Sequence, residues 1–201
     1  MRFGFCHMIL LIPAFWLGSC SYSKKFSHTY YQQNDSLFQS IKRRYKELYQ
    51  EHPFSVAIKD KGFRRIGFEI LTDSIKYVYN FDIGEQRLAD TLTKYNFNVR
   101  GINTLLSDMQ NLHCTWITNL DYYENGQAKY LVFISIRHKK LKAFLRKEKY
   151  FTLAFFDRPR NYDFKGRLLD NQDGKTLQKI NGGLFFKIND RVCYSLSANF
   201  R

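Results

Sequence analysis

The first periodic segment of the chain covers residues 35–51 and has the spacing of a helix. Lys42, Arg43 and Arg44 fall mostly on one side, and Pro53 lies just beyond the end, where prolines often follow helices. The pattern predicts an amphipathic helix with one face against a protein core. Its apolar face consists of Leu37, Phe38, Ile41, Tyr45, Leu48 and Tyr49.

Three runs with alternating apolar positions follow this helix, and each run predicts a β-strand. The connections between them are short, so they predict an antiparallel meander with one buried face. The alternating residues are Phe54, Val56 and Ile58, then Ile66, Phe68 and Ile70, then Ile75, Tyr77, Tyr79, Phe81 and Ile83.

The apolar spacing then returns to that of a helix. Residues 84–95 place Leu88, Leu92 and Tyr95 on one face, and a second stripe begins after Gly101. These segments predict two helices that cover the sheet. The members of the second stripe are Ile102, Leu105, Leu106, Met109 and Leu112.

A β-hairpin is predicted at residues 115–123 and 128–138. Asn125 and Gly126 lie between the two β-rich runs, and an Asn-Gly pair suits a tight turn in which both residues need positive φ. This is a strong local hairpin signal, and it adds two antiparallel strands to the expected sheet.

The remaining third of the chain has a strand pattern at 151–156, an irregular polar stretch at 157–183, and a second hairpin at 184–188 and 191–198. The pattern as a whole predicts a single α+β domain over residues 35–201. We expect its order to be an N-terminal helix, an antiparallel β-meander, a helix pair and further antiparallel hairpins.

Composition supports a folded chain of this kind. Apolar residues make up 44% of the 201 residues and aromatic residues 17%, which allows a sizeable core and excludes a disordered chain. Lys and Arg number 32 against 18 Asp and Glu, so the formal net charge is +14. A charge of this size favours anionic partners or surfaces.

The N-terminus has the pattern of an export signal. Arg2 precedes an apolar run of ten residues, Met8–Leu17. A membrane-spanning helix needs roughly 17–25 such residues, whereas the apolar region of a signal peptide needs about 7–15. The run therefore predicts a signal peptide.

The run ends in Leu17-Gly18-Ser19-Cys20, which resembles the bacterial lipobox. The resemblance implies cleavage before Cys20 and attachment of lipid to its thiol. The expected organisation is a signal peptide at 1–19, a lipidated polar tether at 20–34 and a domain at 35–201. An ordinary secretory signal with an incidental cysteine is the alternative.

The residues after Cys20 favour one side of the cell envelope. In lipoproteins of this kind an Asp in the place of Ser21 often signals inner-membrane retention, so Ser21 implies the outer membrane. Lys24 and Lys25 make this stretch basic, whereas some lineages use an acidic run for surface export. We therefore expect a lipid anchor in the outer membrane, with the protein facing the periplasm.

Two cysteines, Cys114 and Cys193, belong to the predicted domain, because Cys6 leaves with the signal and Cys20 is lipidated. Both lie in predicted strands. In an oxidising compartment they could form one disulfide, or they could be two separately buried thiols. Pairing requires Cα atoms no more than about 7 Å apart, and the sequence leaves both alternatives open.

The densest charged segment, residues 137–149, holds seven Lys and Arg and one Glu. As a helix it would place Leu141, Phe144 and Leu145 under a cationic face, a pattern typical of helices on anionic lipid. A solvated connector is the alternative. The segment has no nucleic-acid-binding motif, so we expect no nucleic-acid partner. The candidate surface contacts are Lys139, Lys140, Lys142, Arg146 and Lys147.

The sequence contains no G-x-S-x-G, no H-E-x-x-H, no Walker-type loop and no G-x-G-x-x-G. Its histidines are not at metal-ligand spacing, and we expect no metal and no cofactor. The sequence therefore favours a non-enzymatic binding or envelope-assembly protein, whose partner is another envelope protein, a glycan or anionic lipid. An envelope hydrolase without a local sequence signature is the alternative.

Overall fold

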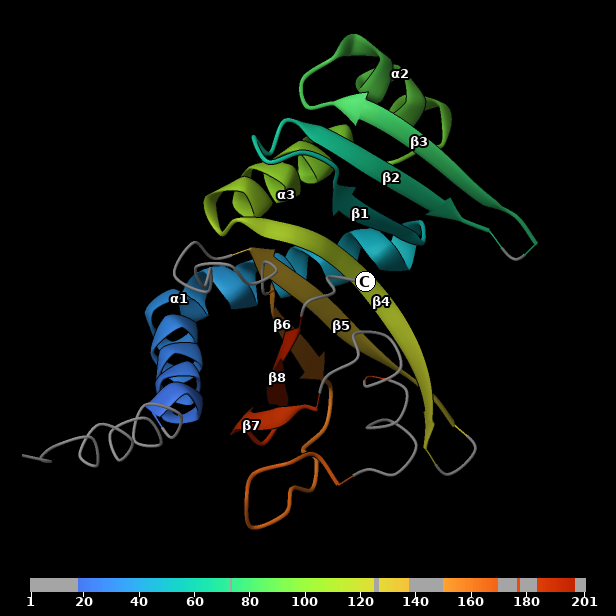
Figure 1. The fold of residues 1–201 in the computed structure, drawn as a ribbon. Helices are drawn as coiled ribbons and strands as arrows, with labels where there is room; N and C mark the ends of the chain where they lie inside the picture. Colours follow the sequence, from blue (N-terminus) through green and yellow to red (C-terminus); the bar gives the residue numbers. More distant parts are fainter. Residues whose placement is uncertain are drawn as a thin grey trace, which may run out of the picture. The chain divides into compact units, whose positions relative to one another are not determined.

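Figure 1 shows the computed structural model of the chain, which consists of two compact units, Met1–Asp35 and Ser36–Arg201. Helix α1 (Gly18–Glu51) is described from Gly18 and continues from the first unit into the second. The structure describes residues 18–72, 74–124, 127–137, 150–169, 177 and 184–197.

The described part of the first unit is helical, whereas the sequence pattern predicts that the helix begins only at residue 35. Two features explain the difference. No glycine or proline interrupts residues 19–51, so nothing in the sequence ends the helix early. The rings of Phe26 and Tyr30, four residues apart, also stack with their centroids separated by 5.7 Å. Lipidation of Cys20 stays a prediction.

The second unit is built on one eight-stranded sheet in which every neighbouring pair is antiparallel. The order across the sheet is β3-β2-β1-β4-β5-β6-β8-β7 (Figure 1). The strands are β1 (Phe54–Ile58), β2 (Arg65–Leu71), β3 (Lys76–Asp82), β4 (Cys114–Glu124), β5 (Gln127–Arg137), β6 (Tyr150–Phe156), β7 (Phe186–Asn189) and β8 (Val192–Ser197).

The predicted α+β architecture is confirmed. The meander β1–β3 follows α1, and the helix pair α2 (Gln86–Lys94) and α3 (Val99–Asn111) follows the meander. The hairpin β4–β5 pairs ten residues of each strand on either side of the predicted Asn-Gly turn. That turn itself, residues 125–126, lies outside the described residues.

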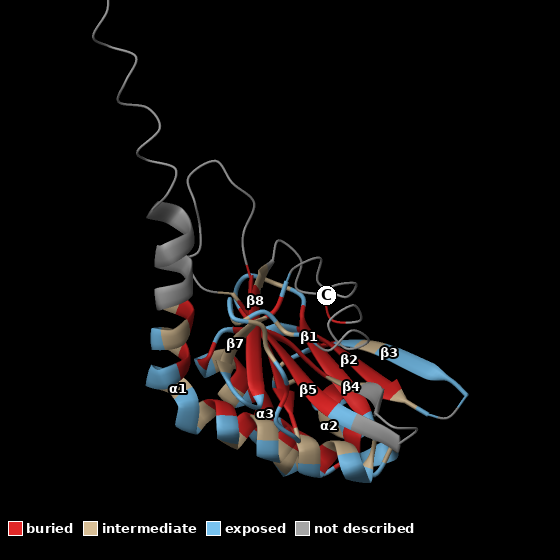
Figure 2. Ribbon diagram, turned by 90° about the horizontal axis from the view of Figure 1, so that it is seen from below, coloured by how far each residue is buried: buried red, intermediate tan, exposed pale blue. Residues whose placement is uncertain are grey.

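Within the second unit, α2, α3 and the part of α1 from Ser36 onward lie on one face of the sheet, with their buried residues turned toward it (Figure 2). Tyr45 of α1 is fully buried there; its ring contacts Phe54, and its hydroxyl donates a hydrogen bond to the Phe54 carbonyl at 2.6 Å. Phe38 contacts Phe155 of β6 on the same face. The apolar stripe of the predicted first helix thus packs against both halves of the sheet.

The opposite face of the sheet carries a second apolar cluster. Leu177 and Phe185, from the connection between β6 and β7, are buried in it. Residues 157–169 of this connection form turns and isolated β-bridges, and Leu177 and Phe185 supply core side chains to the second face. The cluster consists of Ala57, Trp116, Leu131, Phe133, Ala154, Phe156, Leu177, Phe185 and Cys193.

Candidate functional site

Two of the predicted sites lie outside the side chains that the structure describes. Cys20 is the third residue of α1, where the backbone alone is described. The basic residues expected to contact an anionic surface also lie outside the described residues; they are Lys139, Lys140, Lys142, Arg146 and Lys147. Both sites stay predictions.

The domain cysteines are free and buried in the structure, and no disulfide joins them. Cys114 lies on β4 and Cys193 on β8, with β5 and β6 between these strands. Neighbouring strands are about 4.8 Å apart, so the two cysteines are separated by roughly 14 Å across the sheet. This exceeds the Cα separation that a disulfide allows. Of the two alternatives left open by the sequence, the structure has separately buried thiols.

The exposed side of α1 in the second unit carries a continuous polar stripe. Ser36, Ser40, Arg43 and Glu47 follow one another at helical spacing, and none of them is buried. Lys42 lies beside this stripe and is half-buried. The same helix thus presents apolar side chains to the sheet and a row of hydroxyl and charged groups on its other side.

A hollow of about 310 Å³ lies between this stripe and the beginning of α3. Arg43 and Arg44 line it from α1, and Asn98 and Gly101 line it from α3. Asn98 caps α3, because its side-chain oxygen accepts a hydrogen bond from the Gly101 N–H at 2.8 Å. A Cβ at Gly101 would lie 2.8 Å from Leu48 Cδ2, so glycine permits the close approach of the two helices.

A second hollow of about 460 Å³ lies on the other side of the stripe, between α1 and the end of β6. Ser36, Lys42 and Lys46 line it together with Asp157. Ser40 and Arg43 line both hollows, which therefore adjoin along the helix. We call the two hollows together the α1 groove.

The charges in the α1 groove are unevenly neutralised. Lys46 forms an ion pair with Asp157 at 3.0 Å, and Arg44 lies 3.7 Å from Asp108. Arg43 forms no ion pair with any described carboxylate. Burial lowers the pKa of Lys42; Asp157 acts in the opposite direction, while Lys46 and Arg191 lower the pKa further.

This arrangement can bind an anionic group. The Arg43 guanidinium presents a planar set of donors suited to carboxylate or phosphate, and Lys42 adds a second, partly desolvated positive charge. The hydroxyls of Ser36 and Ser40 line the same end of the groove, whereas Glu47 makes the other end acidic. Lys42, Arg43 and the two hydroxyls thus lie together at one end of the α1 groove, between Ser36 and Arg43.

A buried carboxylate lies elsewhere in the second unit, in the meander. Glu69 Oε2 accepts a hydrogen bond from Ser55 Oγ at 2.7 Å and forms an ion pair with Lys76 Nζ at 2.7 Å. Glu69 is 6% exposed and Ser55 1%. The hydroxyl and the ammonium offset the cost of burying this carboxylate, so the trio stabilises the β1–β3 sheet.

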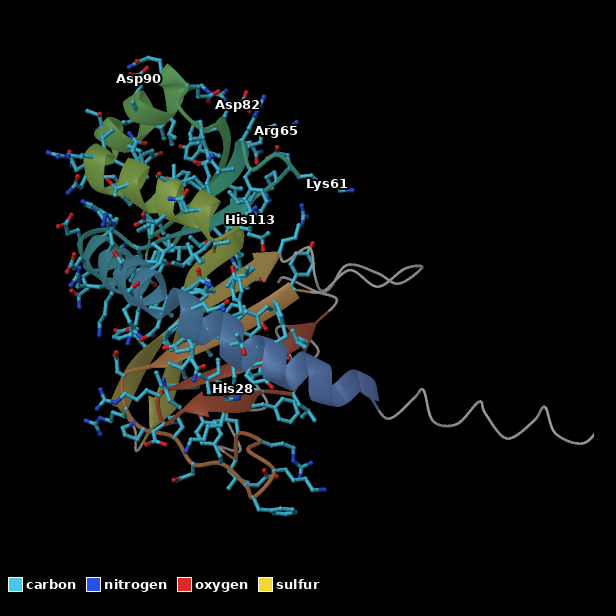
Figure 3. The ribbon with its side chains drawn as sticks, turned by 90° about the vertical axis from the view of Figure 1, so that its left-hand side faces the viewer. His28, Lys61, Arg65, Asp82, Asp90 and His113 are labelled. Atoms are coloured by element: carbon cyan, nitrogen blue, oxygen red, sulfur yellow. The ribbon has the colours of Figure 1, made fainter. Side chains whose placement is uncertain are left out.

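Within the described residues, no group of three or more His, Cys, Asp or Glu side chains could hold a metal ion. The ring of His113, which is labelled in Figure 3, meets the Phe63 ring edge-on with centroids 5.3 Å apart. In the same part of the chain, no helix is both long enough and apolar enough to cross a membrane.

Comparison with known proteins gives no match to this chain among protein-family models, curated proteins or solved structures. The geometry and the sequence motifs are therefore the basis for the function proposed below.

For the cations of the α1 groove, the sequence pattern predicted only that they lie on the outer face of a helix. The groove itself depends on Asp157 of the segment after β6 and on Asn98 and Gly101 at the start of α3. These residues are between 62 and 121 positions away from Ser36 along the chain. No local sequence signal indicates that these residues lie side by side. The basic run Lys42-Arg43-Arg44 is the part of the groove that is evident from the sequence.

Proposed function

We propose that the protein is a lipid-anchored binding protein of a bacterial cell envelope, attached through Cys20 to the outer membrane and facing the periplasm. One observation carries the proposal: Leu17-Gly18-Ser19-Cys20 directly follows a ten-residue apolar run that begins after Arg2. Acyl chains on Cys20 would supply stable anchoring, since each buried CH₂ contributes about 0.8 kcal/mol and two or more chains suffice.

The binding role rests on charge. The signal peptide contains Arg2 as its one charged residue, so the mature chain keeps a net charge of +13. The α1 groove concentrates two of these charges, on Lys42 and Arg43, beside hydroxyl groups. We infer that the groove recognises an anionic group on another envelope protein, a glycan or a lipid. The basic residues of segment 137–149 would add attraction toward the same kind of surface.

The anchor is tested by metabolic labelling with a fatty acid that can be detected on the protein. Cys20→Ala should abolish the label and release the protein from the membrane fraction. Cys6→Ala is the matched control, because Cys6 precedes the apolar run and leaves with the signal peptide. A labelled Cys20→Ala variant would contradict the proposal, as would loss of label in Cys6→Ala alone.

A further inference from the structure

Strand β3 forms one edge of the sheet and leaves apolar side chains uncovered. Ile75, Tyr77 and Val78 are 52%, 36% and 55% exposed. The alternating pattern predicts that Ile75 and Tyr77 lie on a buried face, and for these two residues the prediction is wrong. Figure 2 shows this strand as exposed along most of its length, at the margin of the sheet. A region that the sequence pattern predicts to be part of the core is thus solvent-accessible.

The backbone of β3 also has unused hydrogen-bonding groups. The Ile75 carbonyl accepts from the Thr72 N–H at 3.0 Å, and the Ile83 N–H donates to the Arg64 carbonyl at 2.7 Å. Both contacts point toward β2. Because backbone groups alternate along a strand, those of Lys76, Val78 and the other even-numbered residues point away from β2.

One end of this edge is closed by the protein itself. Arg87 of α2 donates a hydrogen bond to the Asn80 carbonyl at 2.7 Å, and the Glu85 N–H donates to the Asp82 carbonyl at 3.1 Å. Figure 3 shows Asp82 and its ladder neighbour Arg65 at this end, on the side of α2. The N–H and carbonyl groups of Lys76 and Val78 form the open end, and no described group bonds to them.

The other edge of the sheet, β7, is covered. The Lys187 N–H donates to the Gly166 carbonyl at 2.8 Å, and the Leu168 N–H donates to the Phe185 carbonyl at 3.0 Å. Arg167 also forms an isolated bridge with Phe186. Of the two outer strands of the sheet, β3 is therefore the one whose edge is open in the part of the chain that the structure describes.

We propose that two copies of the chain pair through the open ends of β3, in an antiparallel arrangement with its two-fold axis at Tyr77. In this register Lys76 lies opposite Val78 of the partner subunit, and the two pairs related by symmetry form four hydrogen bonds. Tyr77 meets Tyr77 of the partner subunit, and Ile75 meets Tyr79 of the partner subunit. Tyr77 and Ile75 are thereby covered by aromatic side chains on one face of the joined sheet, and Val78 lies against the aliphatic stem of Lys76 of the partner subunit on the other face.

Alternative symmetric registers are less favourable. Centring the pair on Val78 or on Tyr79 would require the Asn80 carbonyl, which Arg87 already occupies. In the register centred on Tyr77, the N–H and carbonyl groups of Lys76 and Val78 all form hydrogen bonds across the interface. The contact between Arg87 and the Asn80 carbonyl is left intact. This register also places no unpaired positive charge in the interface, because the Lys76 ammonium forms an ion pair with Glu69 at 2.7 Å.

A second copy fits better than an unrelated strand. A strand that adds to β3 needs an uncovered edge of its own and apolar side chains matching Ile75, Tyr77 and Val78. The open end of β3 has both properties and is complementary to itself under two-fold rotation. In Figure 1 the end of the β2–β3 hairpin that carries these residues projects away from α2, which leaves room for the partner.

The register is tested by cysteine crosslinking of the full-length chain. Residues opposite each other at a non-hydrogen-bonded position have Cα atoms about 4.5 Å apart, within the range of a disulfide. Mild oxidation of Tyr77→Cys should give a covalent dimer on a non-reducing gel. Asn80→Cys is the matched control: it is also exposed on β3 but lies far from its own symmetry mate in this register. The wild-type chain controls for its native cysteines.

Dimerisation itself is tested by measuring the mass of the wild-type chain in detergent over a range of concentrations. A dimer is expected for the wild type, and a monomer for Val78→Pro and Val78→Lys. The proline removes an outward N–H that bonds to nothing in the monomer, and the lysine faces Lys76 of the partner subunit. Circular dichroism confirms that the variants fold.

Three outcomes would overturn the proposal. The first is a wild-type chain that stays monomeric at every concentration, which would leave the edge to a different protein. The second is crosslinking of Asn80→Cys that equals that of Tyr77→Cys. The third is a dimer that persists in both folded Val78 variants. None of these results depends on the lipid anchor, so failure here is distinct from failure of the proposed function.

Discussion

Burial controls the chemistry of the two domain cysteines. Both are fully buried, and burial raises the pKa of Cys114 to about 12, while interactions with the backbone at Trp116 and Ser135 oppose the shift. Burial also raises the pKa of Cys193, against a small opposing effect of the Arg160 charge. A thiolate is the nucleophile and the metal ligand in cysteine chemistry, so these neutral thiols serve as core side chains.

The thiol pKa predicts a dependence of stability on pH. The folded-state pKa of Cys114 lies above its unfolded value of about 9, so the neutral thiol stabilises the fold below pH 9. That contribution is lost as the pH rises from about 9 through 12, at up to about 1.4 kcal/mol per pH unit. Urea unfolding should show a smaller loss of stability over this interval in Cys114→Ala than in the wild type. Equal slopes in the two proteins would contradict the assignment.

Within the second unit, α1 is the element on which packing and binding meet. Its apolar stripe, including Phe38 and Tyr45, contacts β6 and β1, while Ser36, Ser40 and Arg43 remain accessible on the groove side. Because the buried stripe holds the helix against the sheet, the groove side chains keep fixed positions along it. Changing the groove should therefore alter binding with little effect on stability.

Charge removal in the α1 groove tests this division of roles. The double variant Lys42→Gln, Arg43→Gln should bind vesicles containing phosphatidylglycerol about thirtyfold more weakly, since each of the two cations near an anionic surface contributes about 1 kcal/mol. The control variant removes two charges at exposed positions away from the groove, Lys61→Gln and Arg64→Gln. Cosedimentation with vesicles measures both. Equal weakening in the two variants would show that net charge alone matters and that the groove has no special role.

The β2–β3 hairpin shows how an element can follow its local pattern and still differ in environment. Tyr79 and Tyr95 exchange a hydrogen bond between hydroxyls at 2.7 Å, and Phe81 is buried, so one end of β3 is covered as predicted. Ile75 and Tyr77 continue the same alternation and stay exposed, although the Tyr77 ring still contacts Tyr95 at the end of α2. The period of two predicts which side chains share a face, but it cannot tell how far the covering helix extends.

Net charge is a property of the whole molecule, and it acts in opposite directions on the two proposed interactions. A mature chain of +13 is attracted to an anionic partner, whereas two such chains repel each other. The Debye length falls from about 10 Å at 0.1 M salt to 3 Å at 1 M, so salt screens both effects.

Raising the salt concentration should therefore weaken binding to anionic vesicles and strengthen dimerisation through β3. Vesicle cosedimentation and sedimentation velocity of the same preparation measure the two responses. Neutral phosphatidylcholine vesicles serve as the control for the first response, and the Val78→Lys variant for the second. Dimers that dissociate as salt rises would indicate an interface held by charge rather than by β3 pairing.

The sequence by itself determined the features that depend on neighbouring residues. The apolar run ending at Cys20, the helical stripe of 35–51 and the alternation of β1–β3 are local patterns, and the α+β fold followed from their order. The pattern did not predict the helix through residues 20–34, because this stretch is mostly polar and the apolar stripe at helical spacing begins at Leu37.

Only the tertiary structure decided what depends on strand order and on which element covers which face. It separated Cys114 from Cys193 by three strand spacings, brought Asp157 and Asn98 to the side of α1, and placed β3 at an edge. Hydrophobic periodicity specifies that one face of an element is buried, but it does not specify which other element packs against that face. The reason is that the driving force for burial is non-directional. The pairing partners come from distant parts of the chain, and their choice is made only when the whole sheet assembles.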